Sequence, residues 1–581
     1  MRTAPIAALL LATPMLATAA TLPATETSGG LVVSAQHLAS DIGAGIMRRG
    51  GNAVDAAVAV GYAEAVVNPC CGNIGGGGFM TVRMADGRSA VLDFRETAPA
   101  SASETMFVGP DGKVSGDASL IGPMAVGTPG TVAGLELARE TYGTMSRETL
   151  IAPAIELAEH GFVLERADTD ILDDRTQKFA ADLEMARIFL RPDGTARQPG
   201  DRLIQKALAD TLRKIAAEGP AGFYVGPVAA AIEATGGPTR ADLAGYRAVL
   251  RAPIACDWHG LTILAPPPPS SGGVTLCEIL GILDHDNLRA LGWHGSAGTH
   301  LLIEAERHAF LDRNTQLGDP AFVRNPLDRL LSTEYDAAIR AAIGPGAVPS
   351  ASLDDETPPH EKAETTAYVV MDAAGDAVST TYTLNGLFGA MVMAPGTGVL
   401  LNDEMDDFAI APDTPNLFGL VQGQANRIAP GKRPLSSMTP VIGVRDGKAV
   451  LVAGSPGGSR IITTVLETIL NLTVYDMTPS EAVAAPRLHH QWLPDLVFAE
   501  RFALSPDTRT IMAAMGYHVQ EQEDWGDAVL IAVGPEAASQ AALQAGASSG
   551  SDSARTTGVM RPGLRYGASD PRRPAGSVAV P

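Results

Sequence analysis

The chain has 581 residues, of which 45% are hydrophobic and 19% are charged, so it can bury a large core and form one, two or three domains. Its formal net charge is −22, from 65 acidic and 43 basic residues, and no long run of one sign occurs. Because nucleic acids bind basic surfaces, we do not expect a nucleic acid partner.

Residues 1–20 have the pattern of a secretory signal peptide. One basic residue, Arg2, precedes an apolar stretch over residues 6–16, and small residues follow it. Pro5 and Pro14 disfavour the alternative of a buried N-terminal helix. No later segment has the roughly 18 consecutive apolar residues of a membrane span. We therefore expect a protein without a membrane span that is exported to the periplasm or the medium.

The chain has four cysteines, Cys70, Cys71, Cys256 and Cys277. This number is small for an exported protein held together by disulfides. Adjacent cysteines are badly placed for an ordinary bridge to each other, and no CxxC or His-rich spacing indicates zinc. We expect packing thiols rather than a redox site.

Residues 31–80 have a helical pattern. Apolar residues at positions 38, 42 and 46 recur at helical spacing before two glycines that stop the helix. Asn52 can then cap a second helix over residues 53–67, which has so few polar residues that it must be buried. Two packed helices therefore precede the glycine run at residues 75–78.

Further along the chain, residues 150–160 and 203–217 have the periodicity of amphipathic helices, and residues 256–264 that of a short strand. Residues 344–359 are rich in Pro, Gly, Ser and Asp and follow neither period. We expect them to form a flexible, exposed segment.

The next segment predicts a β-hairpin, with strands over residues 366–372 and 377–385. Pairing Asp372 with Ala377 places Thr365 opposite Leu384, between Thr383 and Asn385. Three polar residues then meet at one strand end.

The tail from residue 536 to residue 557 is dominated by Ala, Ser, Gly and Gln. We expect a disordered insert at residues 537–557 and a short ordered ending around residues 566–570.

Thr365 is a candidate nucleophile. A threonine hydroxyl needs a base to take its proton, and a chain-terminal α-amine is a base with a near-neutral pKa. Thr365 has such an amine only if the bond between Glu364 and Thr365 is broken, and its place at a strand start after a flexible segment allows this. On its own, a Thr-Thr pair is more often part of an ordinary strand.

The sequence SPGGSR at residues 455–460 leads into an apolar helix over residues 461–472. Free N–H groups of Gly457 and Gly458 at a helix N-terminus suit an oxyanion, although a tight packing turn would also use glycines here. Ser455 lies in a sequence similar to the nucleophile elbow of α/β-hydrolases. Its following residue is Pro456, which has no N–H for the oxyanion, and this argues against a serine hydrolase.

Arg95 could bind a substrate carboxylate at two points, or it could pair with a neighbouring acidic residue at the surface. Glu404, Asp406 and Asp407 form an acidic cluster suited to an ammonium group or Ca²⁺, but a solvated acidic turn is the simpler interpretation. Their spacing is not that of an EF-hand loop. The glycines at 75–78 lack the Lys-Ser/Thr of a phosphate loop, so a nucleotide is not indicated.

Together these segments resemble the γ-glutamyltranspeptidase family of N-terminal nucleophile hydrolases, from about residue 30 to the end. The resemblance is carried by residues 50–57, 72–80, 93–96, 127–134, 267–273, 365–366, 434–438 and 455–460. It implies an α/β (α+β) fold with four αββα layers. It also implies a precursor that cuts itself between Glu364 and Thr365 into a large subunit, residues 21–364, and a small subunit, residues 365–581.

The resemblance also implies a role for each matching residue. Thr365 is the nucleophile, Thr383 supports it, and Gly457 and Gly458 hold the oxyanion. The substrate's α-carboxylate site comprises Arg95, Ser436 and Ser437, and its α-amino site comprises Asn385, Glu404 and Asp407. The reaction is transfer of a γ-glutamyl group from glutathione or a related amide to water or to an amino acid or peptide amine, with no metal or organic cofactor.

The chain departs from the family pattern at three places. Many bacterial relatives carry a lid tyrosine where this chain has Phe418, so we do not expect a hydrogen bond from the lid to the Asn385 region. Gly386 and Leu387 replace the family's usual residues, and the pair Cys70-Cys71 stands where many relatives have other residues. These departures predict a different choice of acceptor.

Two alternatives remain open at the level of sequence. A glutaryl- or cephalosporin-type acylase on the same scaffold would use Thr365 equally, but it would not need Glu404 to pair with an ammonium group. An exported binding protein would have the zwitterion pocket without turnover.

Overall fold

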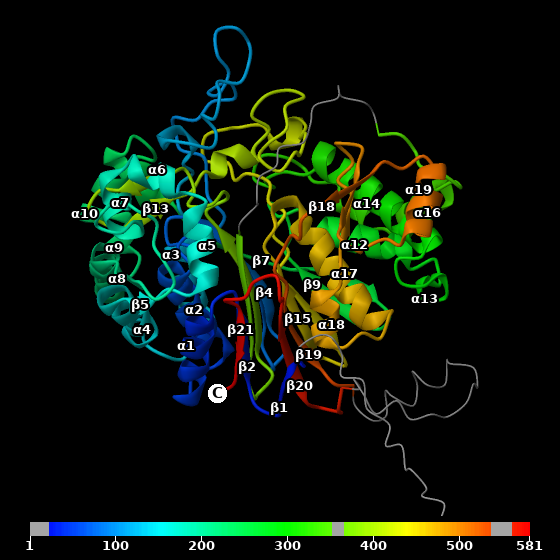
Figure 1. Ribbon diagram of the computed structural model, residues 1–581, viewed down its shortest axis with the longest axis horizontal. Helices are drawn as coiled ribbons and strands as arrows, with labels where there is room; N and C mark the ends of the chain where they lie inside the picture. The colour runs from blue at the N-terminus through cyan, green and yellow to red at the C-terminus, as the bar shows by residue number, and fades with distance from the viewer. Residues whose placement is uncertain (1–22, 351–364, 536–559) are drawn as a thin grey trace, which may run out of the picture.

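A computed structural model describes residues 23–350, 365–535 and 560–581. Two seven-stranded antiparallel sheets stack face to face, and helices cover the outer face of each sheet (Figure 1). This arrangement confirms the predicted αββα layers.

Each sheet is named here after a central strand. From edge to edge, the β10 sheet comprises β21 (Ser577–Ala579), β2 (Leu31–Ser34), β10 (Thr365–Met371), β11 (Ala377–Thr383), β3 (Gly77–Arg83), β4 (Ser89–Asp93) and β7 (Val249–Arg251). The β15 sheet comprises β1 (Thr25–Thr27), β20 (Arg565–Ser569), β19 (Val529–Val533), β15 (Lys448–Gly454), β14 (Val441–Arg445), β9 (Leu261–Ala265) and β8 (Ile254–Trp258). Strands β10 and β11 pack across β15.

The helices divide by side (Figure 1). Those on the side of the β10 sheet are α1 (His37–Arg48), α2 (Ala53–Val67), α3 (Thr131–Tyr142), α4 (Arg147–His160), α5 (Arg166–Asp173), α6 (Thr176–Ala180), α7 (Leu183–Phe189), α8 (Lys206–Glu218), α9 (Ala221–Tyr224), α10 (Gly226–Ala234) and α11 (Arg240–Gly245). Those on the side of the β15 sheet are α12 (Gly272–Leu283), α13 (Leu288–Leu291), α14 (Ser296–Gln316), α15 (Leu327–Leu330), α16 (Thr333–Ala342), α17 (Ile461–Thr473), α18 (Pro479–Ala484) and α19 (Pro506–Ala514).

Three smaller sheets lie outside the sandwich. Their strands are β5 (Phe162–Val163) with β6 (Arg202–Leu203), β12 (Val392–Ala394) with β13 (Val399–Leu401), and β16 (Leu488–His489) with β17 (Val497–Glu500) and β18 (Val519–Gln522).

Strand β10 is buried on both faces, and its alternation decides where each side chain points. Ala367 and Val369 enter the core between the two sheets, whereas Tyr368 and Val370 enter the core beneath α2. Because side chains alternate along a strand, Thr365 faces the space between the sheets and Thr366 faces α2. The side chains of Thr365 and Thr366 therefore lie on opposite faces of the sheet.

The two predicted N-terminal helices are confirmed as α1 and α2. Asn52 caps α2: its side chain accepts from the Asp55 N–H (2.9 Å), and the Asp55 carboxylate accepts from the Asn52 N–H (3.0 Å). Every residue of α2 is buried, as predicted. The helical span of 31–80 was too broad, however, because it contains β2 and β3, which pair with β10 and β11.

Of the other predicted elements, two helices are confirmed with shifted bounds and one strand is wrong. Residues 150–160 belong to α4, which starts three residues earlier, and most of residues 203–217 belong to α8. The single strand predicted at 256–264 is wrong, because the chain reverses there between β8 and β9. His259 and Gly260 have φ values of 49° and 73° at this reversal. Two consecutive positive φ angles are typical of a two-residue hairpin turn.

The predicted hairpin of β10 and β11 is confirmed, but its register is one residue off. Met371 pairs with Ala377, and Thr365 pairs with Thr383 instead of Leu384. Asp372 lies opposite Asp376, because the Asp372 N–H donates to the Asp376 carbonyl (3.0 Å). The loop between them therefore comprises residues 373–375, whereas the prediction had residues 373–376. A one-residue shift exchanges the faces of a strand, so the true register puts Thr383 on the same face as Thr365.

The cysteines form two disulfides, Cys70–Cys71 and Cys256–Cys277, so the prediction of packing thiols was wrong. Cys256 lies on β8 and Cys277 on α12, which packs against β8. That proximity comes from tertiary packing and has no counterpart in sequence spacing.

Several predictions lie outside the described residues: the signal peptide at 1–20, the insert at 537–557, Glu364, and the part of the flexible segment from residue 351 onward. The ordered ending predicted at residues 566–570 is confirmed, since β20 covers most of it. No helix in the described ranges has the length and apolar content to cross a membrane.

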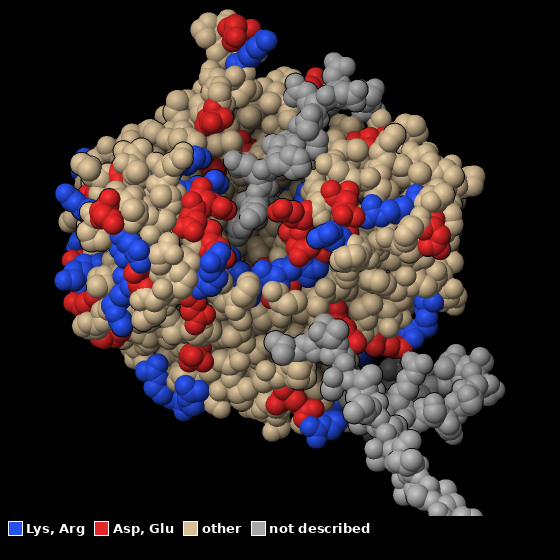
Figure 2. All heavy atoms as spheres, in the orientation of Figure 1, with Lys and Arg blue, Asp and Glu red and all other residues tan. Residues whose placement is uncertain are grey.

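The face of the molecule seen in Figure 2 carries acidic and basic groups side by side, without a basic patch. The surface is hollowed near the centre of this view, between the two helix layers, and charged groups of both signs gather around the hollow.

We predict that Glu64 makes stability depend on pH. This residue of α2 is fully buried, and burial raises the pKa of its carboxyl from 4.5 to about 7. The folded protein thus holds a proton that the unfolded chain has lost, so Glu64 costs stability progressively as pH rises from about 4.5 to 7. Glu64→Gln should be more stable than wild type at pH 8 by on the order of 3 kcal/mol, with little difference at pH 4.5.

Melting temperatures at the two pH values measure this effect. The exposed substitution Glu218→Gln, in α8, is the control and should change neither value. An equal shift for Glu64→Gln at both pH values would contradict the prediction.

Candidate active site

A cleft lies at the N-terminal end of β10, where Thr365 begins the strand. The residues that line it are Arg95, Thr365, Thr383, Asn385, Glu404, Asp407, Phe418, Ser436, Ser437, Met438, Gly458 and Ile461. Every residue predicted from sequence for catalysis or substrate binding is among them except Gly457, which directly precedes Gly458. Ile461 was not singled out, because an apolar residue at a helix start carries no chemical signal.

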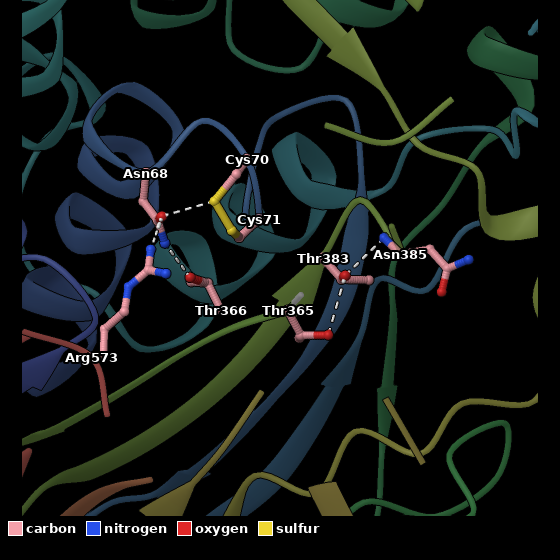
Figure 3. The surroundings of a disulfide bond; sticks show 8 residues. All are labelled: Asn68, Cys70, Cys71, Thr365, Thr366, Thr383, Asn385 and Arg573. Atoms are coloured by element: carbon pink, nitrogen blue, oxygen red, sulfur yellow. Dashed lines mark hydrogen bonds between the residues drawn. A yellow bond between two sulfur atoms is a disulfide. The ribbon is translucent and has the colours of Figure 1, made fainter. Parts of the chain in front are cut away.

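The hydroxyl groups of Thr365 and Thr383 face each other across the β10–β11 pair (Figure 3). Their Oγ1 atoms are 3.4 Å apart, and both side chains are buried. Thr383 Oγ1 also accepts a hydrogen bond from the Asn385 N–H (2.8 Å). Asn385 has a φ of 78°, a left-handed conformation that Asn tolerates better than most residues, and it turns the chain out of β11 into the cleft.

The opposite side of the strand end is held by the loop that follows α2 (Figure 3). The Asn68 side chain donates to the Thr366 hydroxyl and accepts from Arg573 Nη2 (2.6 Å). The backbone carbonyls of Cys70 and Cys71 accept from the N–H groups of Phe388 (2.7 Å) and Leu384 (3.2 Å), on either side of Asn385. The loop that carries the Cys70–Cys71 disulfide thus supports both strands that end at the cleft. Sequence reasoning had no signal for this role of Asn68.

The glycine run at 75–78 packs against the same strand end. A Cβ atom on Gly76 would lie 1.8 Å from the Thr383 carbonyl oxygen, and one on Gly75 would lie 1.9 Å from the Leu400 carbonyl oxygen. The glycines are therefore required for close approach of backbones and have no part in a phosphate loop.

Gly457 and Gly458 follow β15 and precede α17. Both have positive φ values, 132° and 58°. Gly458 lines the cleft with Thr365, and a Cβ on it would meet the Phe418 ring at 2.4 Å. In the described part of the chain, neither glycine N–H has a hydrogen-bond acceptor. Two free N–H groups at the start of a helix can bind an oxyanion.

Ser455 is not available as a nucleophile. Its side chain is buried, its hydroxyl donates to the Pro456 carbonyl (2.7 Å), and its Oγ accepts from the Asp527 N–H (3.2 Å). The structure thus agrees with the argument from Pro456 against a serine hydrolase.

Arg95 lies at the centre of a buried charge cluster. Its guanidinium group bonds to Glu404 and Asp407, and Glu96 Oε2 lies 3.6 Å from Nη1. The alternative of a surface ion pair is wrong, since Arg95 is 0% exposed. Although burial opposes its charge, the three carboxylates raise the pKa of Arg95 above its ordinary value.

Two carboxyl groups of this cluster, those of Glu96 and Glu404, have raised pKa values. Burial raises the pKa of Glu96 to about 7, against the opposing effect of Arg95. Burial also raises the pKa of Glu404 well above its ordinary value, and nearby Glu96 and Asp407 add to this effect. A cation placed beside Glu404 would lower its pKa again, because it favours the charged carboxylate.

Asp406 serves a different purpose from its neighbours. It accepts from the Ser119 hydroxyl (2.7 Å) and from the Leu417 N–H (2.7 Å), so it anchors the segment that carries Phe418. Within the described ranges, no group of three or more His, Cys, Asp or Glu side chains is arranged to hold a metal ion. Phe418 forms part of the cleft wall and has no hydroxyl to bond to Asn385.

The architecture and a buried threonine pair at the start of a central strand define an N-terminal nucleophile hydrolase. The family model described as gamma-glutamyltranspeptidase matches residues 39–561. A glutathione hydrolase proenzyme of Pseudomonas sp. (strain A14) is 52% identical over 94% of this chain and 93% of its own length. The Escherichia coli (strain K12) protein of the same name is 44% identical over 87% of this chain and 88% of its own.

Solved structures agree with these matches. Gamma-glutamyltranspeptidase of Helicobacter pylori has a TM-score of 0.53 and 39% identity over 57% of this chain and 95% of its own. A cephalosporin acylase from Bacillus halodurans shares the fold, with a TM-score of 0.80 at 24% identity over 98% of this chain and 99% of its own. The chain belongs to the γ-glutamyltranspeptidase family and is an enzyme of γ-glutamyl transfer and hydrolysis. The alternative of a binding protein without turnover is thereby set aside.

We predict that Thr383→Val lowers kcat about 10- to 100-fold. Valine keeps the shape of the side chain but removes the hydroxyl beside Thr365 Oγ1, and a hydrogen bond of this kind is worth about 1–3 kcal/mol. Steady-state turnover of the variant measures the loss. Thr381→Val is the control: it lies two residues earlier on the same face, and its hydroxyl has no partner among the described residues. Equal losses in the two variants would contradict a specific role for Thr383.

Proposed function

We propose that this protein cuts itself between Glu364 and Thr365, and that the processed enzyme transfers γ-glutamyl groups from glutathione or related γ-glutamyl amides. The acceptor is water or the amine of an amino acid or peptide. The observation that carries the proposal is the juxtaposition of the Thr365–Thr383 hydroxyl pair with the buried Arg95–Glu404–Asp407 cluster in one cleft.

The charge cluster suits the head of an amino acid. A zwitterion offers a carboxylate to the guanidinium group and an ammonium group to the acids, so it can replace the internal bonds of Arg95 without leaving a buried charge unpaired. In this arrangement Arg95, Ser436 and Ser437 bind the α-carboxylate. The α-ammonium group is bound by Asn385, Glu404 and Asp407.

The remaining groups then fit acyl transfer. Once the α-amine of Thr365 is free, it takes the proton of Thr365 Oγ1, which attacks the γ-carbonyl carbon. The N–H groups of Gly457 and Gly458 hold the oxyanion, and Thr383 orients the nucleophile. The amine leaves with the proton, and water or an acceptor amine attacks the acyl-enzyme. No step requires a metal or an organic cofactor.

Processing would divide the chain into residues 21–364 and 365–581, which stay together as a heterodimer. The proposal is supported by the proenzyme names of the relatives. It is also supported by the interleaving of the two parts in one sheet, where β10 and β11 are flanked by β2 and β3. Export to the periplasm or the medium follows from the signal-like residues 1–20.

A glutaryl- or cephalosporin-type acylase is the alternative, and one relative, an Acylase ACY 1 proenzyme of Pseudomonas sp. (strain V22), is 39% identical over 86% of this chain. A glutaryl group has no ammonium, so it would leave Glu404 and Asp407 without a cationic partner once Arg95 turned to the carboxylate. The two acids beside Arg95 therefore favour the γ-glutamyl group.

The processing step predicts a simple result on denaturing electrophoresis. Wild-type protein should give two fragments, with Thr365 as the N-terminal residue of the smaller one. Thr365→Ala should remain a single chain without activity, whereas Thr365→Ser should still split because it retains a hydroxyl. Cleavage of Thr365→Ala during purification would show that the protein does not cut itself.

Substrate choice is tested with glutathione and a glutaryl amide side by side. We expect kcat/KM for glutathione to exceed that for the glutaryl amide by at least about 10-fold, since a charge-assisted contact with an ammonium group is worth about 1.5–3 kcal/mol. Glu404→Gln should narrow this ratio by lowering the glutathione value. Turnover of the glutaryl amide alone would identify an acylase instead.

A further inference from the structure

Arg313, near the end of α14, lies behind the wall of the cleft and was not indicated by the sequence. Its side chain is 1% exposed. Its Nη2 donates to Ser437 Oγ (2.8 Å), its Nε donates to Ser271 Oγ (3.0 Å), and its Nη1 donates to Asn314 Oδ1 (2.7 Å). Arg313 does not line the cleft itself, but Ser437 does.

Arg313 differs from the other buried arginines in lacking an acidic partner. Arg95 pairs with Glu404 and Asp407, Arg307 with Asp495, and Arg487 with Asp570. Among the described residues, no carboxylate lies within ion-pair distance of Arg313. Burying a guanidinium group without a counter-ion costs several kcal/mol. A charge kept at this cost indicates that a neighbouring group depends on it.

Ser437 connects this charge to the cleft. Its oxygen accepts from Arg313, so its own hydroxyl hydrogen must point to another acceptor, and none is found in the described part of the chain. A hydroxyl that accepts from a cation becomes a stronger donor. Ser271 extends the contact by donating to the Ser436 carbonyl (2.7 Å), so Arg313 holds both neighbouring serines in place.

The charges of the cleft explain why a second cation is needed beside Ser437. Arg95 is bonded to two carboxylates, so Arg95, Glu404 and Asp407 together do not form a net positive site for an anion. A substrate carboxylate entering beside them meets as much repulsion as attraction unless a second cation is near. Arg313 is a buried cation, and it contacts Ser437, the serine assigned to the substrate's carboxylate.

We propose that Arg313 is a positioning and specificity-determining residue, which directs the Ser437 hydroxyl toward the substrate's terminal carboxylate and supplies the positive charge that makes this subsite selective for an anion. The inference deepens the proposed function and rests on it only in requiring an acyl group with a terminal carboxylate. A γ-glutamyl group and a glutaryl group both satisfy that requirement, so the role of Arg313 does not depend on which of them is the natural substrate.

The test uses three anilides with the full, processed enzyme. The γ-glutamyl anilide has both the carboxylate and the amine, the glutaryl anilide has only the carboxylate, and the 4-aminobutyryl anilide has only the amine. Arg313→Met should lower kcat/KM about 10- to 100-fold for the two anilides with a carboxylate, through KM rather than kcat. It should leave kcat/KM of the 4-aminobutyryl anilide within about threefold of the wild-type value. Arg313→Lys should recover part of the loss, because it keeps the charge.

Arg307→Met is the matched control, because Arg307 is a buried arginine of the same helix whose partners lie away from the cleft. It should lower the melting temperature without changing the ratio of kcat/KM values between the anilides. An equal loss of Arg313→Met on all three anilides, or no loss on any, would overturn the proposal.

A second measurement separates this proposal from the proposed function. Calorimetry on the full, processed enzyme compares binding of L-glutamate, glutarate and 4-aminobutyrate, with and without Arg313→Met. These ligands have no amide bond to cleave, so the measurement needs no turnover. If wild type hydrolyses none of the anilides, the proposed function fails, yet weaker binding of L-glutamate or glutarate in the Arg313→Met background still supports the role of Arg313. The role of Arg313 would be rejected if Arg313→Met left the affinity for both L-glutamate and glutarate unchanged. It would also be rejected if neither ligand bound detectably to the protein that retains Arg313.

Discussion

The pairing of β10 with β11 is the constraint on which the rest of the site depends. Seven consecutive residue pairs bring Thr365 opposite Thr383 at the open end of the hairpin. Both faces of β10 are buried, so the strand cannot slide or rotate without moving apolar side chains out of a core. Alternation then directs Thr365 to the space between the sheets, where Gly458 lies, and Thr366 to Asn68. The position of the Thr365 side chain is thus a consequence of core packing.

A second constraint is the electrostatics of the cleft. Burying a charge is costly unless partners compensate it, and Arg95 has such partners in the acids of the short η2 helix (Glu404–Asp407). A ligand that carries both an ammonium group and a carboxylate can replace the ion pairs of Arg95 at a low cost in free energy. An uncharged ligand would leave these charges unpaired. Arg313 adds the missing positive charge from behind the wall. In the proposed function, selectivity for a charged acyl group follows from compensation among buried groups.

Two helical layers supply the supports of the site from opposite sides. The loop after α2 holds the ends of β10 and β11 through Asn68 and the carbonyls of Cys70 and Cys71. From the other side, α14 holds Ser437 through Arg313. The hydrogen bonds by which Asn68 holds Thr366 and Arg313 holds Ser437 join residues far apart in the chain, which is why neither residue has a local sequence signature.

The capped helix α2, the hairpin and the glycine turn at Gly457-Gly458 could be predicted from local sequence, and the resemblance to a family added the residues of the cleft. Periodicity and capping depend on neighbours along the chain, so they can be predicted locally. Four features could not be predicted in this way: the hairpin register, the two disulfides, the strands on either side of the N-terminal helices, and the direct bonding of Arg95 to Glu404 and Asp407. Each of these depends on which surfaces meet in the folded core, and that information is distributed over the whole chain.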